Sequence, residues 1–257
     1  MTKIIFTIIL TASYITATAQ IEKMDTDRPG QTNSPSTVPK KWIQSEIGFL
    51  KQTEKQDAVV FYQHPLLLTK YGLSKCFELR LITEVETIKE KNFNGYTVFT
   101  GLTSVQLGGK FNFLKEKGLR PKTSLIAHYD FARLRKPLYY DTIDGANFRF
   151  AIQHTISEKI SLGYNIGMAW RSFRNSANFI YTLSPAFNIN ERWKAFIEVF
   201  GFIWNDRPPQ NSVDAGTSFY VNDNFKLDAS AGFGLNNQAP DNSFSIGASF
   251  RFKTTNK

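Results

Sequence analysis

The chain has 257 residues, of which 42% are hydrophobic, and a formal net charge of +9. This composition excludes a wholly disordered chain and allows one large domain or two small ones. Cys76 is the only cysteine, so no internal disulfide can form. The basic residues are scattered along the sequence and no nucleic-acid motif occurs, so we expect no nucleic-acid partner.

The first twenty residues have the pattern of a secretory signal. Lys3 supplies a positive start, residues 4–15 are mostly apolar, and Ala17-Thr18-Ala19 fits a signal peptidase site. We therefore predict that residues 1–20 are a cleaved signal peptide. No later run of about 18 apolar residues could form a membrane helix. An exported chain of this kind is either soluble outside the cytoplasm or a β-barrel.

Residues 21–41 form a polar segment, called the leader below. Three prolines and few apolar residues argue against a strand or a stable helix. The sequence allows a flexible periplasmic leader or a plug that folds into a barrel. In a plug, Asp25, Asp27 and Arg28 would pair with charges of the lumen.

Residues 42–252 repeat a unit of roughly ten residues in which apolar and polar side chains alternate. In residues 160–170, every even position is large and apolar, and every odd position is small or polar. A period of two predicts a strand with two unlike faces. The predicted strands are 42–51, 58–71, 76–87, 97–113, 119–132, 146–156, 160–171, 177–189, 192–204, 211–221, 225–236 and 243–252, followed by a tail, 253–257.

The connections between these strands are alternately short and mostly longer. Short turns on one side and long loops on the other are typical of outer-membrane barrels. The sequence therefore predicts an all-β, antiparallel transmembrane β-barrel of about 12 strands. Its location would be the outer membrane of a Gram-negative bacterium, where outer-membrane lipid surrounds it.

Aromatic residues at the strand ends support the same fold. Trp42 and Trp193 begin predicted strands, whereas Trp170 and Trp204 end them, as interfacial belts require. Trp204 breaks the alternation of its strand, so either a bulge lies near Gly201 or Trp204 faces inward. The last strand ends in Phe252, which resembles the signal that the outer-membrane assembly machinery recognises.

The predicted inward face is strongly polar, and a soluble core could not bury so many charges. Two interpretations stay open: the charges brace a narrow barrel, or they line a pore that orders a permeating solute. The densest patch lies on the strand 76–87. The candidate lumen residues are Glu78, Arg80, Glu84, Glu86, Lys110, Asp130, Arg149 and Arg171.

The leader also carries a recognisable motif. Thr26-Asp27-Arg28-Pro29 precedes Thr32, Ser34-Pro35 and Val38-Pro39, and the following strand contains Gln44, Glu46 and Gly48-Phe49. This pattern resembles a family of bacterial outer-membrane transporters associated with the meta-cleavage pathway of phenol degradation. The resemblance implies an outer-membrane channel for small organic or aromatic compounds. It carries no family site residues over to this chain.

Other chemistry finds little support in the sequence. His64, His128 and His154 lie on different predicted strands without metal-ligand spacing, and no phosphate loop or dinucleotide motif occurs. We expect no metal, no cofactor and no enzymatic activity. Two alternatives to a channel remain: a non-transporting barrel that acts as a surface receptor or structural element through the loops 133–145 and 88–96, and a soluble secreted β-sandwich binding module.

Overall fold

The computed structural model describes residues 23–54, 58–135, 143–170 and 177–254. The predicted signal peptide, residues 1–20, lies outside these ranges. So does Arg171, one of the candidate lumen residues. Among the described residues, no helix is long and apolar enough to cross a membrane.

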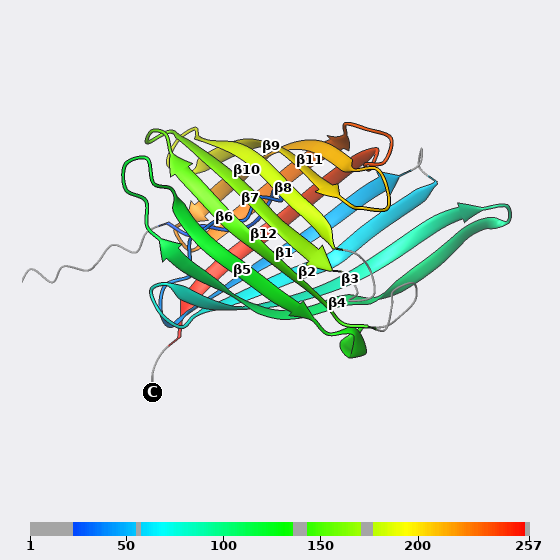
Figure 1. Ribbon diagram of the computed structural model, residues 1–257, viewed down its shortest axis with the longest axis horizontal. Helices are drawn as coiled ribbons and strands as arrows, with labels where there is room; N and C mark the ends of the chain where they lie inside the picture. The colour runs from blue at the N-terminus through cyan, green and yellow to red at the C-terminus, as the bar shows by residue number, and fades with distance from the viewer. Residues whose placement is uncertain (1–22, 55–57, 136–142, 171–176, 255–257) are drawn as a thin grey trace, which may run out of the picture.

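Twelve antiparallel strands form a closed barrel in which each strand pairs with its neighbours in the sequence and the first pairs with the last (Figure 1). The strands are β1 (Trp42–Glu54), β2 (Val59–Gly72), β3 (Phe77–Asn92), β4 (Gly95–Leu114), β5 (Lys122–Asp130), β6 (Gly145–Thr155), β7 (Ile160–Trp170), β8 (Asn178–Asn188), β9 (Trp193–Ile203), β10 (Gln210–Asn222), β11 (Phe225–Gly234) and β12 (Asn242–Lys253), with one short helix, η1 (Ala132–Leu134), after β5. The predicted twelve-stranded antiparallel barrel is confirmed.

The barrel closes along a continuous seam between β1 and β12. Their pairing runs from Trp42 opposite Lys253 to Thr53 opposite Asn242 without a register shift. Closure pairs the edges that an open sheet would expose, which a strand surrounded by lipid requires. The soluble sandwich is therefore excluded, because a sandwich consists of two separate sheets.

The two faces of the barrel are distributed as a membrane protein requires. Large apolar side chains face outward and are exposed, including Leu107 at 51% and Ile246 at 63%, whereas Glu46, Glu78 and Lys110 are fully buried in the interior. In water, this arrangement would expose the apolar side chains and bury the charged ones. In a bilayer, it places the apolar side chains in hydrocarbon.

The prediction of a loop at residues 88–96 is wrong. β3 continues to Asn92 and β4 begins at Gly95, so only residues 93 and 94 form the turn of a hairpin that projects beyond the rim (Figure 1). The charged run Lys89-Glu90-Lys91 hides this strand from an apolar pattern. Outside the bilayer a strand needs no apolar face, so β3 extends into water as a ribbon paired with β4.

Trp204 faces inward, and no bulge is needed. β9 pairs with β10 in unbroken register from Trp193 to Phe202, so the even positions of β9 face the lumen throughout. The Trp204 ring follows this parity and lies 6.0 Å from the Phe202 ring, measured between centroids. Irregularities occur instead in β2, where the register shifts between Gln63 and Leu66.

A charge on the outer face should destabilise the barrel according to its depth. Ile166, in the middle of β7, is 45% exposed, whereas Ile160 begins the same strand. We expect Ile166→Arg to lower the free energy of unfolding in lipid vesicles by about 2–4 kcal/mol, because arginine near the bilayer midplane is poorly solvated. Ile160→Arg, near the interface, should cost about 1 kcal/mol or less. Equal losses in guanidinium titrations of the two variants would contradict the assignment of this face to lipid.

Candidate functional site: a lumen divided by the leader

The leader, residues 23–41, lies inside the barrel and crosses its lumen. It begins beside the β10–β11 turn, where the Met24 amide donates to the Asp223 carbonyl at 3.0 Å, and it ends where β1 begins at Trp42. Polar contacts join it to every strand except β10, and Lys23 lies over the ring of Tyr220 on β10. Its wall partners include one residue from each of these eleven strands: Glu46, Lys70, Arg80, Lys110, Ser124, Arg149, Asn165, Thr182, Glu198, Asp228 and Ser245.

Asp27 is the centre of a buried ion cluster. Its carboxylate lies 2.7 Å from the Lys70 ammonium, 2.8 Å from the Arg80 guanidinium and 3.3 Å from the Lys110 ammonium. These three cations lie on β2, β3 and β4, so one leader carboxylate joins three neighbouring strands. A buried charge without a partner is costly, whereas this arrangement gives each cation a carboxylate.

Two wall carboxylates complete the cluster. Glu46 accepts the backbone amides of Asp27 and Arg28, each at 3.0 Å, and lies 2.6 Å from the Lys70 ammonium. Glu78 accepts from Arg80 at 2.9 Å and from the amide of Val38 at 2.6 Å. The leader therefore supplies both a charge and backbone donors to side chains that the wall alone would leave unsatisfied.

Arg28 occupies a niche at the barrel seam. Its Nη2 donates to Asp228 at 2.9 Å and to Ser245 at 2.8 Å. Gly48 and Gly247 pair directly across the seam, and a Cβ at either position would lie 1.8 Å or 2.4 Å from the Arg28 guanidinium. Only glycine at both positions leaves room for this side chain.

The remainder of the leader is held through its backbone. Glu198 accepts the amides of Gln31 and Thr32, and Asn165 exchanges two hydrogen bonds with the Asn33 backbone, at 2.7 and 3.1 Å. Further along, the Lys110 ammonium donates to the carbonyls of Ser34 and Ser36 at 2.7 and 3.0 Å. Because the segment has no secondary structure of its own, wall side chains satisfy its backbone.

The environment of the leader lowers the pKa of two of its carboxylates, Asp25 and Asp27. Burial alone would raise the pKa of Asp25, but the positive charge of Lys194 and hydrogen bonds from Ser34 and Ser36 more than offset it, so the pKa is lowered to about 2. Burial also opposes ionisation of Asp27, yet Lys110, Lys70 and Arg80 hold its pKa well below the ordinary value.

The structure places the predicted lumen residues at the leader, along an open cavity, or nearer the rim. Glu78, Arg80 and Lys110 meet at the leader, as described above, whereas Glu84 and Arg149 line an open cavity to which Arg80 also contributes. Glu86 lies opposite Gln63 in the register of β2 and β3, and Asp130, near the rim, lies 3.4 Å from Arg135. Of the leader residues singled out, Asp27 and Arg28 contact wall charges directly, and Asp25 accepts from Ser34.

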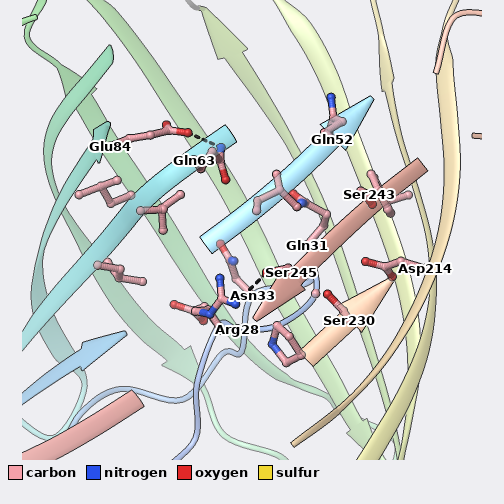
Figure 2. Close-up of a pocket in the computed structure, with 18 of the residues that line it drawn as sticks. Arg28, Gln31, Asn33, Gln52, Gln63, Glu84, Asp214, Ser230, Ser243 and Ser245 are labelled. Atoms are coloured by element: carbon pink, nitrogen blue, oxygen red, sulfur yellow. Dashed lines mark hydrogen bonds between the residues drawn. The ribbon is translucent and has the colours of Figure 1, made fainter. Parts of the chain in front are cut away.

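The leader separates two cavities of unequal size. The larger, about 430 Å³, lies on the loop side, and the leader residues Arg28, Gln31 and Asn33 line part of it (Figure 2). The smaller, about 90 Å³, lies on the turn side among Ser161, Lys194 and Lys226. Among the described residues, no group of three or more His, Cys, Asp or Glu side chains is placed to hold a metal ion.

The walls of the larger cavity include apolar side chains that the sequence analysis did not single out. Leu50, Leu66, Leu68 and Ile82 lie on β1 to β3, and Phe200 and Phe202 lie on β9. Lys70, which faces the lumen from β2, is also not among the candidate lumen residues predicted from the sequence. On β9 the inward face is polar at Lys194 and Glu198 but aromatic at Phe200 and Phe202, so the alternation ends toward the loop side; on β2, the register shift reverses the parity between Gln63 and Leu66.

Closed antiparallel topology, an apolar outer face and a charged lumen crossed by the N-terminal segment define the protein as an outer-membrane β-barrel. The chain belongs to the family described as "Putative MetA-pathway of phenol degradation", whose model matches residues 26–252. No curated protein matches the sequence.

Several solved outer-membrane barrels share the fold. An outer membrane channel from Pseudomonas putida F1 superposes with a TM-score of 0.68 at 9% identity, covering 87% of this chain and 99% of that one. The KdgM porin gives 0.54 at 10% identity, with coverage of 80% and 99%. The NanC porin gives 0.54 at 8% identity, with coverage of 81% and 98%. At these identities the similarity concerns the fold.

Removing the leader carboxylate at the centre of the cluster should destabilise the barrel. Asp27→Asn leaves Lys70, Arg80 and Lys110 to share the remaining wall carboxylates, so we expect a loss of about 3 kcal/mol or more in guanidinium unfolding. Asp206→Asn, in an exposed connection, is the matched control and should change stability by less than about 0.5 kcal/mol. Similar values for the two variants would show that the cluster does not stabilise the fold.

Acid should release the leader only at low pH. Because the pKa of Asp25 is lowered from 3.8 to about 2, its stabilising contribution is complete above pH 3.8 and is lost as the pH falls toward 2. Hydrogen exchange of residues 23–41, corrected for intrinsic rates, should show full protection at pH 5 and progressive loss below pH 3.8. Asp25→Asn should reduce this protection already at pH 5. Loss of protection between pH 7 and pH 5 in the unmodified protein would contradict the assignment.

Proposed function

We propose that the protein is a channel for small solutes in the outer membrane, and that these solutes include small organic or aromatic compounds. The cavity of about 430 Å³ on the loop side of the leader supports this proposal most directly. It has the size of a small-molecule site and combines apolar walls with a few polar groups. Membership of a family named for phenol degradation supports the same class of solute.

The arrangement of the lumen suggests how such a channel works. A solute enters from the loop side, where the cavity is wide, and meets the leader before it reaches the smaller cavity on the turn side. Passage requires the leader to shift, because its backbone crosses the lumen between the two. The protein then needs no cofactor and no catalytic group; its partners are the surrounding lipid, the assembly machinery that inserts it and the solute.

A surface receptor is a second candidate, and one observation favours it. The hairpin formed by the ends of β3 and β4 projects from the rim (Figure 1) and exposes Phe93 and Tyr96 at its tip. Exposed aromatic side chains are common at protein interfaces. A receptor would insert into membranes but conduct nothing, whether or not the leader is present.

Solute flux with the leader free, locked or absent tests the channel. Thr32 and Thr182 bring their hydroxyl oxygens within 2.6 Å, so cysteines at these positions, in a chain with Cys76→Ser, should form a disulfide between leader and wall. In liposome-swelling assays with small solutes, we expect flux through the reduced protein to fall at least several-fold on oxidation. Deletion of residues 23–40 should raise flux above that of the intact chain.

Two controls make these results decisive. Each single cysteine variant should be insensitive to oxidation, and heat-modified migration in gels should show that every variant is folded. A folded barrel that passes no solute with or without the leader would overturn the channel in favour of the receptor.

A further inference from the structure

Arg149 of β6 is a lumen cation without a carboxylate of its own. Its Nη1 donates to the Gln31 carbonyl at 3.1 Å, and in the described ranges no carboxylate lies within ion-pair distance of it. The other inward arginines of the cavity differ, because Arg28 pairs with Asp228 and Arg80 with Asp27 and Glu78. Arg149 lines the larger cavity and keeps guanidinium donors for a ligand.

The strand register sets Arg149 opposite an aromatic ring. Arg149 pairs with Gly167 on β7, Gly167 pairs with Ile180 on β8, and Ile180 pairs with Phe202 on β9. Strands lie about 4.8 Å apart, so the backbones of Arg149 and Phe202 are separated by about 14 Å along the wall. Both side chains extend inward from these positions and line the same cavity.

Gly167 leaves room for the stem of Arg149. A Cβ at this position would lie 2.9 Å from Cγ of Arg149, so the arginine stem leans over the glycine toward β8. Beyond it, Ile180 is buried in the wall at 3% exposure. Gly167 and Ile180 are thus covered, and the surface that this part of the wall offers to a solute comes from Arg149 and Phe202, which both line the cavity.

The ring of Phe202 belongs to an aromatic stripe. Phe200 lies edge-on to Phe202, with centroids 6.3 Å apart, and Trp204 lies 6.0 Å further toward the rim, with the Arg207 guanidinium 3.9 Å above its ring. Such a stripe offers faces and edges for another aromatic ring. Four carboxylates also line the cavity: Asp27 and Glu46 pair with Lys70, and Glu84 and Asp214 would repel a second negative charge on the solute.

We propose that the larger cavity binds small aromatic monocarboxylates of the benzoate class, with the carboxylate on Arg149 and the ring on Phe202. This site rests on the proposed channel function for its role in transport, but the binding itself does not. A guanidinium suits a carboxylate because its planar donors can form two parallel hydrogen bonds. The leader forms one side of the site through Gln31, so a bound solute contacts the segment that it must displace.

Binding is measured through Trp204. The detergent-purified protein is titrated with 4-nitrobenzoate, whose nitroaromatic ring quenches nearby tryptophan fluorescence, and benzoate is used to displace it. Benzamide has the same size without the charge and should displace it at least tenfold less well, as expected for a charge-assisted hydrogen bond worth more than a neutral one. Trp204→Phe should abolish the quenching and so verify the reporter.

Variants separate recognition from support of the leader. Arg149→Gln should weaken benzoate at least tenfold and leave benzamide almost unchanged, and Phe202→Leu should weaken both. Arg149→Lys keeps a donor for the Gln31 carbonyl and should retain part of the preference for benzoate. Arg192→Gln, in an exposed turn, is the matched control and should bind as the unmodified protein does.

The outcomes distinguish this site from the channel. Equal displacement by benzoate and benzamide, or an unchanged preference in Arg149→Gln, would overturn the site even if liposome flux is observed. Conversely, selective benzoate binding in a barrel that passes no solute with or without its leader would overturn the channel and leave the site standing.

Discussion

Hydrocarbon around the barrel disfavours ionised side chains on its outer face and favours them in the lumen, and the remaining organisation follows from this constraint. Among the largest fully buried side chains, Lys70, Arg80, Lys110 and Lys226 are cations, and a narrow interior holds too little water to solvate them all. Carboxylates of the wall and of the leader pair with these buried cations. Asp27 is the most connected of these, since it meets three cations from three neighbouring strands.

The same contacts that satisfy the wall also divide the lumen. The leader runs where charges are dense and leaves the larger cavity where the wall is apolar, beside Leu66, Ile82 and Phe202. The buried ion cluster and the larger cavity therefore lie at different depths of the same lumen. Under the proposed channel function, one segment of under twenty residues both stabilises the wall and closes the passage.

Much of the fold follows from the sequence, but the site follows only in part. The alternation in β7, β11 and β12 indicates strands and identifies their lipid face, because one face is apolar and the other small or polar. On β9, Glu198 marks the inward face, but Phe196, Phe200 and Phe202 share that face, so the alternation does not reveal the aromatic wall of the cavity. The partners of Asp27 and Arg28 are equally hidden, since no local rule relates residue 28 to residue 228.

That long separation bears on how the molecule is made. Arg28 precedes all twelve strands in the sequence, yet its side chain bonds to β11 and β12, the last strands, and lies across the seam where β12 meets β1. The niche that holds the Arg28 side chain cannot exist until β12 has paired with β1. Docking of this arginine is therefore a late event in folding, and a partly assembled barrel lacks this contact until its last strand has paired with its first.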